Sequence, residues 1–158
     1  MRTLILAVGR VRSGPERTLY EAYAKRLHPP PEIIEVEERR KLDPARRVAR
    51  EAELLINRVP AGAFVFVLDG SGRALSSEAL AQRMRRLRDA GTPAACFVIG
   101  GADGLGKPVL DAAGMVLSLG PMTWPHMLVR TLVVEQLYRA EAILSGHPYH
   151  RAGAPPGR

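Results

Sequence analysis

Apolar runs that suit β-strands alternate along this chain with longer segments that suit helices, and this alternation constrains the fold more than any other feature. Five runs rich in β-branched residues are predicted as strands, at residues 3–8, 32–36, 63–68, 94–99 and 115–119. A helical segment separates each run from the next. Strand, helix, strand repeated along one chain is typical of an α/β domain with a mostly parallel sheet of five to six strands flanked by helices.

The helical segments have recognisable ends. They are predicted at residues 15–27, 44–58, 77–90, 107–113 and 125–145. Asp43 before Pro44 supplies an N-cap and a first-turn proline, and Ser76 or Ser77 caps the third helix. Gly146 marks the end of the last helix, which carries an apolar stripe.

Length and composition predict one domain. The 158 residues suffice to bury a normal core, so we expect a single domain over residues 1–151 and a disordered tail over 152–158. The first apolar run is too short for a signal peptide and no later run approaches a membrane span, which predicts a cytoplasmic protein without membrane contact. The single cysteine, Cys96, lies in an apolar run and is expected to be a buried hydrophobe.

The charge balance favours a polyanionic partner. The net charge is +7, and only three of the 23 basic residues are lysine, so arginine dominates and offers forked contacts to phosphate. Each cluster of basic residues is either an RNA-facing patch or a solvated helix face. The two clusters are Arg39, Arg40, Lys41, Arg46, Arg47 and Arg50, and Arg83, Arg85, Arg86 and Arg88.

Glycine-bearing segments follow three of the predicted strands, at residues 68–72, 100–104 and 119–124. Ligands bind beyond the carboxyl ends of parallel strands, and glycine lets main-chain groups approach a ligand closely. These segments therefore predict a small-molecule pocket built mainly from main chain. Residues 9–14 lack the glycine spacing of a dinucleotide site, and no nucleotide-triphosphate loop is present. His147 and His150 lack further ligands nearby, so no metal is expected.

Several short motifs, in order and spacing, resemble the RlmH family of SPOUT methyltransferases over nearly the whole chain. They are Ala7-Val8-Gly9, Leu68-Asp69 with its glycine turn, Gly100-Gly101 with Gly104, Met122-Thr123-Trp124-Pro125-His126, Leu137-Tyr138-Arg139-Ala140 and His147-Pro148-Tyr149-His150-Arg151. The chain departs from the family at Ala102 and Asp103, where members usually carry Pro and Glu. The extension after Arg151 is also unusual for the family.

The resemblance implies a SPOUT-type α/β knot, with a deep trefoil knot in the C-terminal part of the domain. It also implies S-adenosyl-L-methionine as cofactor, held largely by backbone atoms of the knotted loops, in agreement with a main-chain pocket. The residues that match this site are Leu68, Gly100, Gly101, Leu119, Gly120, Pro121, Met122, Thr123 and Trp124.

The reaction implied by the resemblance is methylation of N3 of pseudouridine 1915, in helix 69 of the large-subunit rRNA, with the assembled ribosome as expected substrate. The N3 proton must be removed, and His126 acts on that proton, holds a phosphate or has only a structural role. Asp103 is either a second base or cofactor contact or a local cap. Arg130, one turn after His126, is a candidate for RNA contact near the site.

The family also implies a homodimer with composite active sites. The tail of one subunit completes the site of its partner, which makes Tyr149, His150 and Arg151 candidate catalytic residues. Tyr149 would stack on a flipped base and Arg151 would hold phosphate.

Two other functions stay open at this point. One is a related knotted methyltransferase that acts on transfer RNA or on another ribosomal site, because the cofactor loops say little about the nucleotide modified. The other is a non-enzymatic, ribosome-associated RNA-binding module. Assays of methyl incorporation and of S-adenosylmethionine binding distinguish these alternatives.

Overall fold

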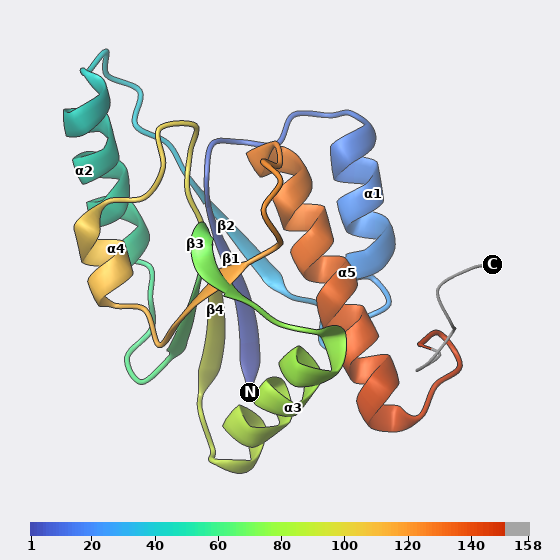
Figure 1. Cartoon of the computed structure of the whole chain (residues 1–158). Coiled ribbons are helices and arrows are strands. Elements are labelled where there is room, and N and C mark those ends of the chain that lie inside the picture. Colours follow the sequence, from blue (N-terminus) through green and yellow to red (C-terminus); the bar gives the residue numbers. More distant parts are fainter. Residues whose placement is uncertain (151–158) are drawn as a thin grey trace.

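All five predicted strands are present and form one sheet (Figure 1). The structure, a computed structural model, describes residues 1–150. The strands are β1 (Arg2–Val8), β2 (Glu32–Val36), β3 (Phe64–Ala74), β4 (Ala94–Ile99) and β5 (Met115–Ser118). Their order across the sheet is β2-β1-β4-β3-β5, and every pairing is parallel. The prediction of a mostly parallel sheet is therefore confirmed.

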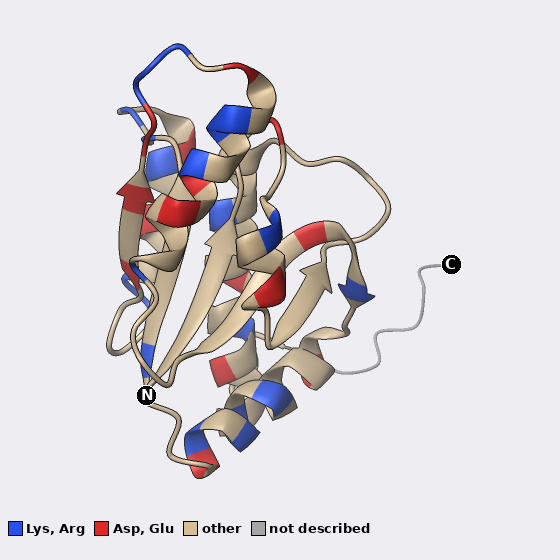
Figure 2. Ribbon diagram, turned by 90° about the vertical axis from the view of Figure 1, so that its left-hand side faces the viewer, with Lys and Arg blue, Asp and Glu red and all other residues tan. Residues whose placement is uncertain are grey.

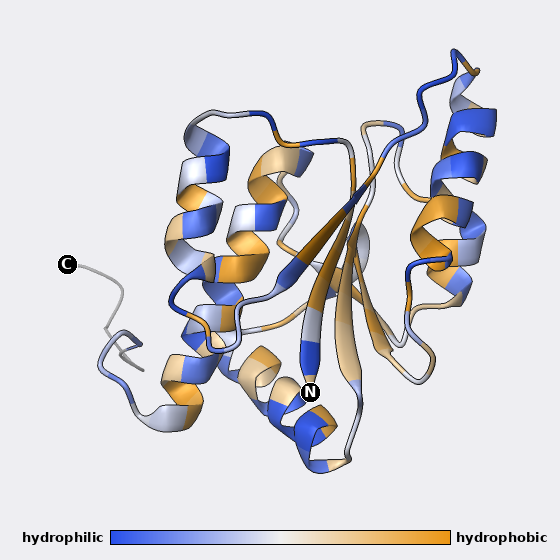
Figure 3. Cartoon of the chain, turned by 180° about the vertical axis from the view of Figure 1, so that it is seen from behind, coloured by the Kyte–Doolittle hydropathy of each residue, from blue (hydrophilic) through white to orange (hydrophobic). Residues whose placement is uncertain are grey.

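Helices cover both faces of this sheet. They are α1 (Pro15–Ala24), α2 (Pro44–Ile56), α3 (Ser77–Asp89), α4 (Lys107–Asp111) and α5 (His126–Ser145). Helices α1, α3 and α5 lie on one face, and α2 and α4 lie on the other, as the view from behind also shows (Figures 1 and 3). Because parallel strands share a direction, the segments that leave β1, β3, β4 and β5 meet along one edge.

The strands supply the core because they are covered on both sides. Every residue of β4 is buried, and one hydrophobic cluster lies on each face of the sheet. Phe66 and Phe97 are stacked, with ring centroids 4.6 Å apart. Cys96 is fully buried as predicted, and burial raises the pKa of its thiol to about 11, so the thiol stays protonated at neutral pH.

The predicted helix signals act as expected at most ends. The Asp43 side chain accepts a hydrogen bond from the Arg46 N–H (3.0 Å), and Ser76 accepts one from the Ala79 N–H (3.1 Å). Gly146 ends α5 in the left-handed conformation. Pro125, by contrast, occupies the N-cap, so α5 begins one residue later than predicted, at His126.

Strand β3 is longer than its apolar run predicted. Its pairing with β5 is interrupted after Leu68 and resumes at Arg73, so residues 69–72 form an irregular bulge. A Cβ on Gly72 would lie 2.7 Å from the carbonyl carbon of Val116, so only glycine lets the two backbones approach this closely. The sequence read these residues as a turn because glycine and aspartate favour turns.

In helix α5, side chains outside the predicted apolar stripe are buried as well as those within it. Val133, Leu137 and Ala140 are buried as expected, but Arg130 and Thr131 are buried as well. The reason is that α1 and α3 both pack against α5, which also rests on the sheet. The sequence periodicity showed only the sheet-facing stripe.

Candidate active site

A cavity of about 500 Å³ lies at the carboxyl edge of the sheet, where β3, β4 and β5 end. It is lined by all nine residues predicted to hold a cofactor, and by His126. The nine are Leu68, Gly100, Gly101, Leu119, Gly120, Pro121, Met122, Thr123 and Trp124. The fold thus brings together three segments that are separated by 27 and 14 residues along the sequence.

The segment after β4 is shaped for close approach of the main chain. Gly101 and Gly104 form a local bridge, in which the Gly104 N–H donates to the Gly101 carbonyl at 3.2 Å. A Cβ on Gly100 would lie 2.8 Å from Leu105 Cγ and 2.9 Å from the Gly104 carbonyl oxygen. A side chain at Gly100 would therefore push this turn out of place.

The segment after β5 turns sharply at Gly120. This glycine has a φ of 104°, which side chains rarely tolerate. The Ser118 hydroxyl accepts a hydrogen bond from the Gly120 N–H (3.1 Å) and lies 3.2 Å from the Gly120 carbonyl. Farther along the same segment, the side chains of Met122 and Trp124 are largely exposed beside the cavity (72% and 41%).

His126 is the first residue of α5 and lines the same cavity. Its partial burial lowers the pKa of the imidazole below the usual 6.5, and the nearby positive charge of Arg130 lowers it further. The imidazole is therefore neutral at neutral pH. A neutral imidazole can accept a proton from a bound substrate.

The structure adds Asp69 to the cavity wall, a residue that the cofactor prediction did not include. Its carboxylate accepts hydrogen bonds from the N–H and the hydroxyl of Ser71, at 2.8 and 2.5 Å. This local turn sits in the bulge of β3, at a cavity whose other lining is largely apolar side chains and glycine. Its position directly after a strand was the available sequence signal.

Asp103 does not line the cavity, so its predicted role as base or cofactor contact is not supported by this geometry. Its carboxylate instead accepts from the Arg47 guanidinium of α2 at 3.2 Å. Glu51, one turn farther along α2, lies behind Gly101, and burial raises the pKa of its carboxyl. Helix α2 therefore supports the Gly100–Gly104 segment from outside.

The prediction that Arg130 contacts RNA is wrong for this structure. The side chain is 1% exposed, because it points inward from α5 toward the ends of β1 and β2. The sequence placed it correctly on the face of His126. That face, however, is covered by the segment that follows β1.

Tyr149 and His150 lie outside the cavity of their own chain. The Tyr149 hydroxyl donates to Glu135 at 2.9 Å, and its ring packs edge-on against Tyr138 at 4.6 Å. Burial, together with hydrogen bonds to Tyr23 and Glu135, raises the pKa of Tyr149 well above its usual value. His150 pairs with Glu78 at 2.8 Å. Arg151 and the 152–158 tail lie outside the described residues.

Much of the first basic cluster is engaged by acidic neighbours. Basic and acidic stretches follow one another along α2 and the segment before it (Figure 2). The pairs are Arg39–Glu37, Arg40–Glu38, Arg46–Asp43, Arg47–Asp103 and Arg50–Glu53. The Arg40 hydrogen bonds lower the pKa of Glu38 to about 2, so this pair stays charged. Lys41 and Arg12 form no ion pair within residues 1–150.

In the second cluster, Arg85 pairs with Asp89 and Arg88 with Glu141. Arg83 lies over the Phe64 ring, 4.6 Å from its centroid.

Within residues 1–150 there is no group of three or more potential metal ligands, and none of the helices is long and apolar enough to cross a membrane.

Comparison with known proteins identifies close relatives. A family model described as "Predicted SPOUT methyltransferase" matches residues 1–150. A protein of Rhodospirillum rubrum named ribosomal RNA large subunit methyltransferase H is 56% identical over 152 residues, covering 96% of this chain and all of the relative. A protein of the same name from Paramagnetospirillum magneticum is 54% identical, covering 96% of this chain and 99% of the relative.

A solved structure shares the fold. It is a probable methyltransferase from Bordetella pertussis Tohama I, with a TM-score of 0.56 and 17% sequence identity. The superposition covers 88% of this chain and 95% of the other. The similarity supports the three-layer architecture described above.

Proposed function

Because the chain belongs to the SPOUT methyltransferase family, we propose that it transfers the methyl group of S-adenosylmethionine to large-subunit rRNA. The proposed target is N3 of pseudouridine 1915 in helix 69, reached in the assembled ribosome. The substrate places the proposed activity in the cytoplasm. The trefoil knot expected for this family stays a prediction.

The observation that carries this proposal is the convergence of the three glycine-bearing segments on the cavity that also contains His126. A cavity of about 500 Å³ is within the usual range for small-molecule and cofactor sites. It offers apolar surface from Leu68, Ile99 and Leu117, and main-chain groups at Gly100 and Gly120. This mixture suits a cofactor with a planar base and polar edges.

The residues present therefore fit S-adenosylmethionine, with the 100–104 and 119–124 segments as its proposed cradle. When bound, this cofactor supplies a methyl group on a positively charged sulfur, which is open to attack by a nucleophile. The Asp69 carboxylate lines the same cavity and offers an acceptor for hydroxyl groups. The protein's contribution is then to orient the two reactants and to exclude competing water.

His126 is proposed to accept the N3 proton of the target base. A protonated imide nitrogen has no available lone pair, so the proton must leave as the methyl group arrives. The imidazole is neutral at neutral pH because burial and Arg130 lower its pKa. It stands at the wall of the cavity, between the proposed cofactor cradle and the segment that follows β1.

We further propose that the chain acts as a homodimer in which Tyr149, His150 and Arg151 complete the partner's site. In its own chain the described part of the tail lies against α5 and α3, through Tyr149 and His150, and does not line the cavity. A site that needs these residues must therefore receive them from another subunit or after a rearrangement of the tail.

The proposed function is tested by locating the methyl group. Ribosomal RNA from a strain that lacks this protein is compared with RNA from its parent by mass spectrometry. The proposal expects one methyl group to be lost from the helix 69 pseudouridine and restored by the gene. Purified protein should then methylate ribosomes from the deletion strain more efficiently than free rRNA or tRNA.

Other results would replace the proposal. Loss of a methyl group elsewhere in rRNA or tRNA would support a related methyltransferase of another site. Unchanged RNA, together with absence of S-adenosylmethionine binding in calorimetry, would support a non-enzymatic RNA-binding module.

Basic residues at the carboxyl edge of the sheet are expected to hold RNA. Arg12 and Lys41 follow β1 and β2, are exposed and form no ion pair among the described residues. Replacing both by Ala should weaken RNA binding and reduce the slope of log affinity against log salt by about one to two. Filter binding across a salt series measures this slope, and calorimetry should show unchanged cofactor affinity.

The matched control removes two charges from the opposite edge, by Arg2→Ala and Arg58→Ala. Arg2 begins β1 and Arg58 follows α2, so both lie near the amino ends of the strands. This double variant should keep the salt slope of the parent. If the two double variants have the same slope of log affinity against log salt, Arg12 and Lys41 do not contact RNA.

A further inference from the structure

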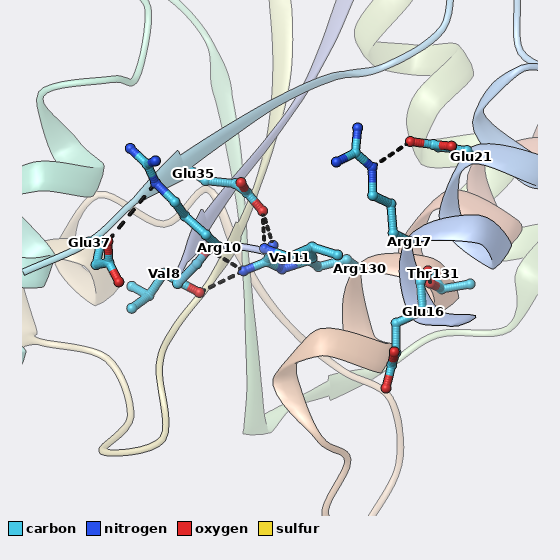
Figure 4. Close-up of polar contacts among 11 residues, drawn as sticks. Val8, Arg10, Val11, Glu16, Arg17, Glu21, Glu35, Glu37, Arg130 and Thr131 are labelled. Atoms are coloured by element: carbon cyan, nitrogen blue, oxygen red, sulfur yellow. Dashed lines mark hydrogen bonds and ion pairs between the residues drawn. The ribbon is translucent and has the colours of Figure 1, made fainter. Parts of the chain in front are cut away.

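Arg130 is the most deeply buried charged side chain among the described residues. It is 1% exposed, and burial lowers the pKa of its guanidinium, although not enough to neutralise an arginine. The guanidinium donates to the carbonyl oxygens of Val8 and Gly9, each at 2.7 Å, and to the carboxylate of Glu35 (Figure 4). A buried charge of this kind is tolerated only because each contact is charge-assisted.

These contacts fix the segment that follows β1. Glu35 accepts a second hydrogen bond, at 2.7 Å, from the N–H of Val11 (Figure 4). Arg130 therefore holds residues 8 and 9, and Glu35 holds residue 11. The ion pair connects the second turn of α5, the end of β1 and the end of β2.

His126 and Arg130 both lie beside the Gly9 backbone. A Cβ built on Gly9 would lie 3.7 Å from His126 Nε2 and 3.9 Å from the nearer Arg130 nitrogen. The imidazole, the Gly9 backbone and the guanidinium thus occupy one small volume. His126 and Arg130 are also one helical turn apart on α5, so a shift of the guanidinium shifts the turn that carries the imidazole.

We propose that Arg130 and Glu35 are positioning residues for His126, which hold its ring at the wall of the cavity and balance the charge beside it. Arg130 provides the fork that orients the turn. Glu35 places a negative charge beside Arg130 and so reduces the positive charge that Arg130 presents to the imidazole. The importance of this arrangement for catalysis rests on the proposed function. The contacts of Arg130 and Glu35 do not depend on that function.

The other charged and titratable groups near the pair are the same in the parent and in the variants proposed below. From α1, Tyr20 faces Arg130, but burial raises the pKa of its hydroxyl to about 12, so it is neutral. Arg10 turns away toward Glu37, at 4.0 Å (Figure 4). The Asp69 carboxylate across the cavity is engaged by Ser71. Glu16 lies beside Arg130 in a small cavity between α1 and β2, and its carbonyl faces Thr131.

Removing one charge at a time gives opposite expectations. In Arg130→Gln the positive charge is lost and Glu35 remains, so the pKa of His126 should rise. In Glu35→Gln the negative charge is lost and Arg130 remains, so the pKa of His126 should fall. A purely structural role would loosen the same turn in both variants and would move the pKa in one direction.

The experiment is an NMR titration of the four histidine Cε1 protons, with His126 assigned from its missing signal in His126→Asn. It is read on the full chain without RNA or cofactor. Arg130→Lys keeps the charge but loses the fork, so it should leave the titration of His126 almost unchanged and still reduce kcat about 10- to 100-fold. Arg17→Gln, which breaks only the exposed pair with Glu21 on α1, should change neither quantity.

A rise of the His126 pKa in Arg130→Gln together with a fall in Glu35→Gln supports the proposal. Shifts of the same sign in both variants, or no shift in either, overturn it. If Arg130→Gln does not fold, the test uses the other two variants. A fall of the His126 pKa in Glu35→Gln, with little change of that pKa in Arg130→Lys, then supports the proposal, and any other pattern contradicts it. If the variants show these pKa shifts but the parent protein has no methyltransferase activity, the proposed function is overturned and the positioning role of Arg130 and Glu35 is not.

Discussion

Ending the chain at Pro148 is expected to reduce methyl transfer to rRNA by about 100-fold or more while leaving S-adenosylmethionine affinity within about threefold. The reason is that Tyr149 and His150 do not line the cavity proposed for the cofactor. Their proposed place is the active site of the partner, where they would orient the target base. Methyl incorporation into ribosomes and calorimetry with the cofactor measure the two quantities separately.

A chain that ends at Arg151 is the control for this truncation. It lacks only residues 152–158 and should keep the full rate. Full turnover by the chain that ends at Pro148 would show that the tail takes no part in the reaction. Loss of cofactor binding in that chain would indicate instead that the contact of Tyr149 with Glu135 and Tyr138 supports the fold.

Mixing two inactive variants tests whether the site is shared. In a dimer of the Pro148 truncation with full-length His126→Ala, a site with both an intact His126 and an intact tail forms only if the tail crosses to the partner. If the tail crosses to the partner, the mixture should recover activity, up to about half that of the parent for each mixed dimer. A mixture as inactive as its components would contradict the composite site.

Gly100→Ala is expected to weaken S-adenosylmethionine binding by about 30-fold or more. The new Cβ would lie 2.8 Å from Leu105 Cγ and 2.9 Å from the backbone oxygen of Gly104, so the turn must move. Overpacking of this kind costs about 1–3 kcal/mol, and about 2 kcal/mol corresponds to a 30-fold change in affinity. Calorimetry measures the affinity, and thermal unfolding shows whether the fold is retained.

Gly14→Ala is the matched control for this substitution. Gly14 has an extended backbone that any residue adopts, and its Cβ would meet only the Glu16 carboxylate at 3.4 Å. It lies at the start of α1, away from the cavity lining, so cofactor affinity should not change. Equal affinities for Gly100→Ala and the parent would place the cofactor elsewhere.

Local signals in the sequence were enough for most of the secondary structure. The apolar run at residues 94–99 became a fully buried strand because a strand covered on both faces needs apolar side chains on both. Asp43 and Ser76 cap α2 and α3 because each side chain bonds to a main-chain N–H only three residues away. The extension of β3 was missed because its pairing depends on Gly72 and Val116, which are far apart in sequence.

The candidate site followed from the same alternation. Since parallel strands end along one edge, glycine-bearing segments after three strands were expected to meet, and they line one cavity. The predictions for Asp103 and Arg130 did less well. Each had the correct residue type near the site, but Asp103 bonds to Arg47 and Arg130 turns into the protein.

The sequence by itself determined the order of strands and helices along the chain, the edge at which a ligand site lies, and the three glycine-bearing segments that line it. These depend on hydrophobic periodicity, on capping residues and on glycine, which act over a few neighbouring residues. Only the tertiary structure decided which charged side chains face solvent and which are buried in ion pairs. Arg130 and Glu35 are 95 residues apart and meet only because β1, β2 and α5 pack together. A charge finds its partner through that packing, and no local pattern records it.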